Sequence, residues 1–144
     1  MLFRSYGFLL TFTPAAVKTI GDFLCDTGTK PSGYDLILTG DLGSVGSELL
    51  YELLLREYSV DISSVHKDCG LMIYDMEKQD VHAGGSGCGC GGSVLCSHII
   101  NSMREGKFRN ILFIATGALM SPVSSLQGQS IPAIAHLVNI KKGV

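Results

Sequence analysis

Residues 82–98, HAGGSGCGCGGSVLCSH, hold the side chains of this sequence that are best suited to chemistry. Three cysteines and two histidines stand there among six glycines. Such a composition can serve as a zinc site, as a glycine-rich cradle for nucleotide phosphates, or as the loop of a catalytic cysteine. It can also be the glycine-padded start of a buried helix, so the spacing of the residues has to decide.

A metal site and a nucleotide cradle both need spacings that differ from those found here. Structural zinc sites use C-x(2-4)-C knuckles, whereas a single residue separates Cys88 from Cys90. The letters GCGCGG at 87–92 match the dinucleotide fingerprint, which requires an acidic residue about 20 positions further on, after the next strand. That strand is expected to end in Thr-Gly at 116–117. We therefore expect no metal site and no cofactor.

A cysteine nucleophile is harder to dismiss. If a helix begins near residue 88, its dipole favours the thiolate of Cys88 or Cys90. A nucleophile of this kind also needs a base within hydrogen-bond reach. The sequence leaves open which histidine, if any, lies there; the candidates are His66, His82, His98 and His136.

Two Gly/Ser-rich segments point to an anion as ligand. GDLGSVGS at 40–47 and GGSGCGCGGS at 84–93 each lead from an extended piece into a predicted helix. Free N–H groups at helix starts accept carboxylate or phosphate, and loops at strand ends converge in α/β sheets. The bland alternative is that the glycines allow close packing. The candidate ligand-binding residues are Asp41, Gly43, Ser44, Gly85, Ser86, Gly87 and Cys88.

Two acidic residues stand out by their position. Asp41 follows a buried apolar run, and Asp68 lies in the stretch before the second glycine-rich segment. Asp41 suits a cation such as calcium or a ligand hydroxyl group, but capping of the next helix is the commoner role.

A layered α/β domain has to position these segments. Apolar residues at helical spacing predict helices over 13–28, 45–57 and about 88–106. Strands are predicted for YDLILTG at 34–40, NILFIAT at 110–116 and IPAIAHLVNI at 131–140, with shorter extended pieces at 58–65 and 81–85. Residues 66–75 are ambiguous between helix and strand, and residues 1–12 lack a period and read as an irregular start. We predict one domain over 1–144 with a mixed sheet.

Composition excludes several classes of protein. The formal net charge is -2 and no basic stripe is present, which argues against nucleic acid as a partner. The five cysteines and the lack of a secretory signal favour reduced thiols and a cytosolic compartment. The apolar runs are much shorter than the roughly 20 residues of a transmembrane helix. Peripheral attachment to a membrane complex is compatible with all of this.

Several longer motifs carry a resemblance to a known family. YDLILTGDLGSVGS, KDCGLMIYD, AGGSGCGC, ATGALMSP and SIPAIAH occur in this order. From about residue 13 to 140 the chain resembles the C-terminal half of the stage V sporulation protein AD family of endospore-forming bacteria. The resemblance implies a thiolase-like fold with two similar α/β halves. Each half has a mixed five-stranded sheet with helices on both faces, and together they form an αβαβα body.

The resemblance also implies a function. It implies a protein that binds dipicolinic acid (pyridine-2,6-dicarboxylate), alone or together with calcium.

 It implies that the protein works with other stage V sporulation membrane proteins at the forespore inner membrane, to which it is peripheral. There it helps to move dipicolinate and its calcium salt into the spore, and it is linked to their release at germination.

The second-half catalytic residues of related enzymes have no counterpart in this sequence. Thiolases and ketoacyl synthases combine a cysteine of the first half with His, and Asn or a second His, of the second half. The corresponding loops here read Gly-Asp-Leu-Gly at 40–43 and Gly-Gly-Ser-Gly-Cys at 84–88. We therefore expect a binding protein on an enzyme scaffold and no catalytic residues. An acyltransferase with a cysteine nucleophile is the alternative.

The resemblance leaves the N-terminal half without a counterpart. In this fold the two halves share a core, and the pocket lies between them. We therefore expect the chain to be a fragment, a truncated product, or a half that pairs with a separate N-terminal half or with a second copy of itself.

Overall fold

Four strands form one mixed sheet in the computed structural model, which describes residues 3–85, 87–118, 123, 126–128 and 132–143. The sheet order is β2-β1-β3-β4. β1 pairs in parallel with β2 and with β3, whereas β4 runs antiparallel to β3. The strands are β1 (Leu36–Thr39), β2 (His66–Asp68), β3 (Asn110–Ala118) and β4 (Ala133–Lys141). The mixed sheet is thus confirmed, with four strands in the described residues where the resemblance implied five.

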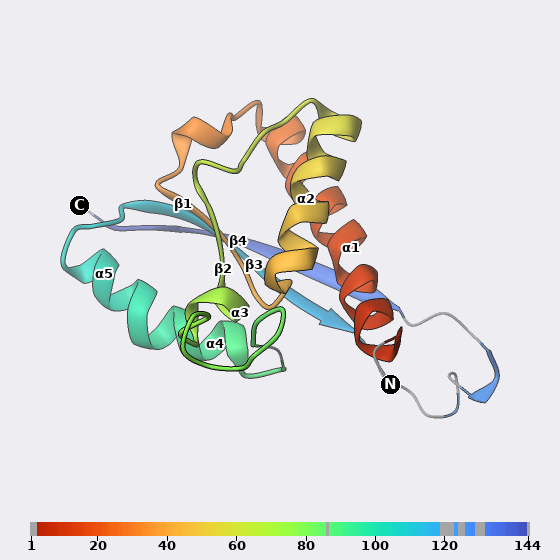
Figure 1. Cartoon of the computed structure of the whole chain (residues 1–144). Coiled ribbons are helices and arrows are strands. Elements are labelled where there is room, and N and C mark those ends of the chain that lie inside the picture. The colour runs from red at the N-terminus through yellow and green to blue at the C-terminus, as the bar shows by residue number, and fades with distance from the viewer. Residues whose placement is uncertain (1–2, 86, 119–122, 124–125, 129–131, 144) are drawn as a thin grey trace.

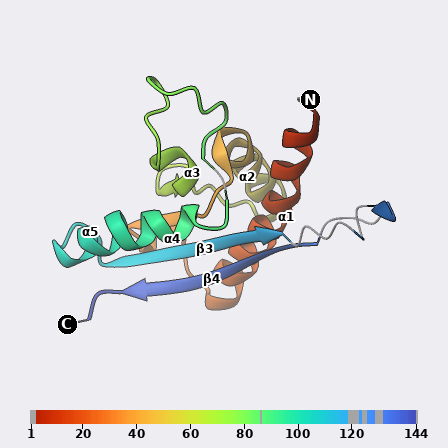
Figure 2. The same ribbon diagram turned by 90° about the horizontal axis from the view of Figure 1, so that it is seen from below.

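Helices cover both faces of this sheet (Figures 1 and 2). One face carries α1 and α2, and the other carries α3 and the helix that runs through α4, η2 and α5. The helices are α1 (Phe3–Thr27), α2 (Gly43–Tyr58), α3 (Cys69–Met72), α4 (Cys90–Val94) and α5 (Ile100–Arg104), with a 3-10 turn η1 (Pro31–Gly33) and a π-helical stretch η2 (Leu95–Ile99).

Two hydrophobic clusters result, one on each face of the sheet. Side chains alternate along a strand, so Ile37 of β1 points to one cluster while Leu36 and Leu38 point to the other. The α1/α2 cluster consists of Phe12, Ala16, Val17, Ile20, Leu24, Tyr34, Ile37, Leu42, Leu50, Leu54, Ile62, Leu112, Ile114 and Ala135. The α4/α5 cluster consists of Leu36, Leu38, Cys69, Cys90, Val94, Ile99, Met103 and Ile111.

The start of α1 differs from the sequence prediction. The helix begins at Phe3 and runs through Pro14, whereas we expected an irregular segment over 1–12 and a helix start at residue 13. A proline inside a helix removes one backbone hydrogen bond and costs about 3 kcal/mol. Burial of Phe12 before the proline, and of Ala16 and Val17 after it, offsets that cost.

Two predicted extended pieces are turns instead. Residues 59–65 lie in no strand, although the carbonyl oxygen of Val65 accepts a hydrogen bond from the N–H of Ile37 at 2.8 Å. Ser59 ends α2 with φ 55°, and Asp61 closes a turn by accepting a hydrogen bond from the N–H of Ser63 at 2.8 Å. Residues 81–85 also form turns, with φ 52° at His82. Alternating apolar residues were the signal in both cases, and local turn chemistry outweighed it.

The ambiguous stretch 66–75 contains both kinds of structure. It begins as β2 and turns directly into α3 at Cys69. Asp68 caps α3 by accepting a hydrogen bond from the N–H of Gly70 at 3.0 Å. The helix predicted over about 88–106 begins at Cys90 and ends at Arg104, and Gly106 follows with φ 83°.

Candidate functional site

The two Gly/Ser-rich segments meet at the carboxyl edge of the parallel strands. The N–H of Ser44, in the first turn of α2, donates to the carbonyl oxygen of Ala83 at 2.8 Å. The N–H of Gly87 donates to Asp41 Oδ2 at 3.1 Å. These bonds join residues about forty positions apart in the chain, so the predicted convergence of the segments is confirmed.

Asp41 ties the second glycine-rich segment to the sheet. Its side chain is 8% exposed. Besides the bond from Gly87, its Oδ1 accepts a hydrogen bond from the Thr116 hydroxyl at 2.7 Å, near the end of β3. The cap position of α2 is Leu42, and no side chain caps the helix from there. Capping of α2 by Asp41 is therefore wrong, and the carboxylate bridges a loop and a strand instead.

Asp68 is the most heavily bonded side chain of the site. It is 2% exposed and lies at the end of β2. Its Oδ2 accepts from the Thr39 hydroxyl at 2.6 Å and from the N–H of Leu42 at 2.9 Å. Its Oδ1 accepts from the N–H groups of Gly43 at 2.9 Å and Gly70 at 3.0 Å. One carboxylate thus ties together the end of β1 and the starts of α2 and α3.

Burial and hydrogen bonding act on the charge of Asp68 in opposite directions. Burial raises the pKa of the Asp68 carboxyl above its ordinary value, and the bonds from Thr39 and the three backbone N–H groups oppose that rise. The carboxylate lies at the starts of two helices, where partial positive charge gathers on the backbone.

A buried histidine stands behind Asp68. His66 is 8% exposed; its Nε2 lies 2.9 Å from the Thr39 hydroxyl and its Nδ1 lies 2.8 Å from the Tyr51 hydroxyl. Burial lowers the pKa of His66 to about 4, so the ring is neutral at pH 7. Sequence reasoning named His66 only as a candidate base for a cysteine nucleophile, and it missed Thr39 and Tyr51. The available signal was His-x-Asp at the end of a short strand, because residues two apart point to the same side.

Glycine is required where these loops approach one another most closely. Gly43 has φ 68°, and a Cβ added there would lie 2.5 Å from the carbonyl oxygen of Ala83. Gly84 has φ 120°, and its added Cβ would lie 2.8 Å from the carbonyl oxygen of Gly70. No L side chain fits such contacts without movement of the backbone. The interpretation of these glycines as close packing is therefore confirmed.

Four of the predicted ligand-binding residues have backbone N–H groups that bind partners inside the protein. Those of Gly43, Ser44 and Gly87 bind Asp68, Ala83 and Asp41 as described above. That of Gly85 donates to the carbonyl oxygen of Gly70 at 2.7 Å. A ligand at these N–H groups has to share or replace an acceptor, which leaves ligand binding a prediction. Ser86 lies outside the described residues, and Cys88 is exposed.

The cysteines divide into buried and exposed ones. Cys69 and Cys90 lie in the α4/α5 cluster, where burial raises the pKa of Cys69 to about 12 and that of Cys90 to about 11. Both thiols are therefore protonated at neutral pH. Across the described residues, which include every cysteine and histidine, no hydrogen bond joins a cysteine to a histidine.

The described residues contain neither a candidate metal centre nor a candidate membrane span. Within them, no three His, Cys, Asp or Glu side chains come close enough together to hold a metal ion. No helix in the described part of the chain combines the length and the apolar character needed to cross a bilayer.

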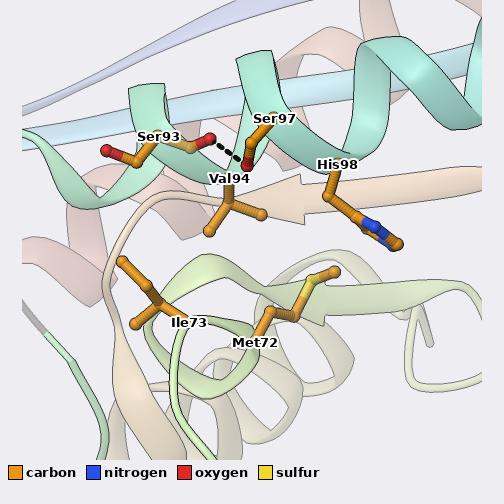
Figure 3. A pocket seen from close by; sticks show the side chains of 6 residues that line it. All are labelled: Met72, Ile73, Ser93, Val94, Ser97 and His98. Atoms are coloured by element: carbon orange, nitrogen blue, oxygen red, sulfur yellow. Dashed lines mark hydrogen bonds between the residues drawn. The ribbon is translucent and has the colours of Figure 1, made fainter.

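A shallow groove lies beside the glycine-rich segment, between α3 and the helix of α4 and η2 (Figure 3). Its volume is about 380 Å³. Ile73 connects the groove to the segment, because its Cγ2 would lie 2.6 Å from a Cβ added at Gly85. The Ser97 hydroxyl donates to the carbonyl oxygen of Ser93 at 2.6 Å. The lining side chains are Met72, Ile73, Ser93, Val94, Ser97 and His98.

Comparison with known proteins gives matches over most of the chain. The family model of stage V sporulation protein AD matches residues 8–141. Stage V sporulation protein AD of Bacillus subtilis (strain 168) is 46% identical over 123 residues. The match covers 85% of this chain and 36% of the relative, so the chain spans about a third of the length of that protein.

Proposed function

The chain belongs to the stage V sporulation protein AD family, and from that premise we propose that it forms one side of a dipicolinate-binding site and catalyses no reaction. The observation that carries the proposal is the meeting of segment 40–47 with residues 83–87 at one edge of the sheet. In α/β proteins this edge is where ligands bind. A planar dicarboxylate bound there shares the backbone N–H groups of these segments with their present acceptors or replaces those acceptors.

The fold belongs to the same proposal. We expect a thiolase-like half whose sheet gains a fifth strand and whose pocket is completed by an N-terminal half or by a second copy. Exposed apolar side chains of β4 support this, because Ile134 and Val138 are 52% and 53% exposed. The proposed partners in the cell are other stage V sporulation proteins at the forespore inner membrane.

Charge favours a role for calcium. Dipicolinate is a dianion, and the stretches 31–55 and 79–103 contain no lysine or arginine. The segments that meet at the site therefore supply hydrogen bonds without a formal positive charge. The negative charge of dipicolinate therefore has to be balanced by bound calcium or by a cationic side chain of the N-terminal half or second copy that completes the pocket. We propose that the calcium salt binds with higher affinity than free dipicolinate.

Titration calorimetry of dipicolinate into the full chain, with and without calcium, tests the proposal. We expect G87A to weaken binding about tenfold, since Gly87 has φ 119° and a strained side chain there displaces the N–H from Asp41. The matched control is G28A, which also has a positive φ, 61°, and open space around it, but lies at the end of α1.

Two results would contradict the proposal in different ways. Equal affinities of G87A and the unaltered chain would remove the glycine-rich segment from the site. A lack of binding by the unaltered chain, with calcium and without it, would overturn dipicolinate binding by this chain.

Acyl transfer is the rival function, and the exposure of Cys88 is the observation in its favour. We expect iodoacetamide to alkylate Cys88, while Cys69 and Cys90 react only after unfolding because they are buried. We expect no turnover of acyl-CoA, since no base is bonded to Cys88 in the described residues. Mass spectrometry of the alkylated peptides and a thiol-release assay measure the two results. Turnover that disappears in C88S would establish the acyltransferase.

A further inference from the structure

Four side chains form a continuous hydrogen-bonded chain beneath the glycine-rich segments. The Tyr51 hydroxyl lies 2.8 Å from His66 Nδ1, and His66 Nε2 lies 2.9 Å from the Thr39 hydroxyl. That hydroxyl lies 2.6 Å from Asp68 Oδ2. The chain crosses from α2 through β2 and β1 and returns to β2. Thr39, His66 and Asp68 are buried, and Tyr51 is half-buried.

The direction of this chain follows from its donors and acceptors. Three backbone N–H groups bind Asp68, and these groups only donate, so an ionised Asp68 also accepts the Thr39 proton. The Thr39 oxygen is then left to accept a proton from His66 Nε2. His66 Nδ1 is then bare and accepts the Tyr51 proton. A protonated Asp68 that donates to Thr39 would reverse the three bonds between these four side chains and place the imidazole proton on Nδ1.

We propose that the hydrogen bonds are donated in one direction, from Tyr51 through His66 and Thr39 to an ionised Asp68. We also propose that Asp68 is the positioning residue of the dipicolinate site. The inference of a positioning role rests on the proposed function. Tyr51, His66 and Thr39 orient the carboxylate, and none of them is assigned a contact with the ligand.

The bonds around Asp68 reach both sides of the site. Its Oδ1 accepts a hydrogen bond from the N–H of Gly43, and the N–H of the next residue, Ser44, donates to the carbonyl oxygen of Ala83. The same Oδ1 accepts a hydrogen bond from the N–H of Gly70, and the carbonyl oxygen of Gly70 accepts one from the N–H of Gly85. Both routes end in residues 83–85. Asp68 therefore sets the distance between the start of α2 and the glycine-rich segment, where the ligand has to fit.

The state of His66 is a direct test of the direction. Long-range ¹H–¹⁵N correlation spectra of the full chain with ¹⁵N-labelled histidine report which ring nitrogen carries the proton. The His66→Gln variant identifies the His66 signals. We expect a proton on Nε2 and a bare Nδ1 at pH 7, and we expect Y51F to change the Nδ1 shift. A proton on Nδ1 in the unaltered chain would overturn the proposed direction.

The positioning role is tested with Thr39, which orients Asp68 from β1. We expect T39V to weaken dipicolinate binding about tenfold, since the buried carboxylate loses its shortest hydrogen bond. T39S restores the hydroxyl and should return the affinity to within about twofold of the unaltered chain. The control is T19V: Thr19 donates to the carbonyl oxygen of Ala135 at 2.9 Å, between α1 and β4.

Amide hydrogen exchange separates a failure of this inference from a failure of the proposed function. We expect T39V, and not T19V, to speed exchange at the amides of Gly43 and Gly85, whether or not dipicolinate binds. If the unaltered chain does not bind dipicolinate, the proposed function fails and the exchange rates alone decide the positioning role. Unchanged exchange at both amides in T39V, or unchanged affinity where binding occurs, would overturn it.

Discussion

At the scale of single residues, two buried ionisable groups share the space between α2 and β2. His66 is neutral because burial lowers its pKa, and Asp68 is held by four hydrogen bonds while burial raises its pKa. Among the described residues, neither group forms an ion pair with a lysine or arginine. Backbone N–H groups and one hydroxyl replace a counter-ion here.

His66 makes stability depend on pH in a predictable direction. Its pKa is about 4 in the folded chain, against 6.5 as its ordinary value. At pH values between these two pKa values, His66 is protonated in the unfolded chain and neutral in the folded chain. The contribution to stability is therefore complete above pH 6.5 and is lost as the pH falls toward 4, by at most about 3 kcal/mol. The raised pKa of Asp68 acts in the opposite direction, because the folded chain takes up that proton first.

Urea unfolding at several pH values checks this expectation. We expect the free energy of unfolding of the unaltered chain to fall from pH 6.5 to 4, and H66Q to lack most of that fall. H136Q is the control, because His136 is exposed on β4 and should leave the fall unchanged. Parallel pH curves for H66Q and the unaltered chain would show that another group causes the dependence.

At the scale of elements, hydrophobic spacing predicted most of the fold. It placed β1, β3 and β4, and it placed the cores of α1 and α2, because each of these elements buries an apolar face or strand. It failed at the start of α1, because a proline such as Pro14 is typical of the first turn of a helix but here lies inside one. It also failed at 58–65, where the Asp61 turn breaks an apparently alternating pattern.

The location of the candidate site was predictable from the sequence, but its hydrogen-bond partners were not. Glycines that follow predicted strands indicated where segments 40–47 and 84–93 meet, since parallel strands end at one edge. The acceptors of the N–H groups of Gly43 and Gly85 lie fifteen residues or more away in the chain, at Asp68 and Gly70. No local pattern contains that information. The bonds to Thr39 and His66 depend in the same way on the pairing of β1 with β2.

At the scale of the whole molecule, the two hydrophobic clusters share one sheet. β1 is central to this arrangement: Ile37 lies in the α1/α2 cluster, Leu38 lies in the α4/α5 cluster, and both are 0% exposed. The same strand leads into Asp41 and the site. Loss of packing on either face therefore disturbs β1, and through it the opposite face and the site.

The described part of the chain should consequently unfold as one cooperative unit. We expect I37A and L38A each to lower the free energy of unfolding by about 2–5 kcal/mol, and L55A, at an exposed position, to change it by less than about 0.5 kcal/mol. Far-UV circular dichroism reports all helices, whereas tyrosine fluorescence reports chiefly the α1/α2 face, where Tyr34, Tyr51 and Tyr58 lie. The two signals should give coincident urea transitions in every variant. Separate transitions in L38A would mean that the α4/α5 face unfolds alone, and that β1 does not couple the two clusters.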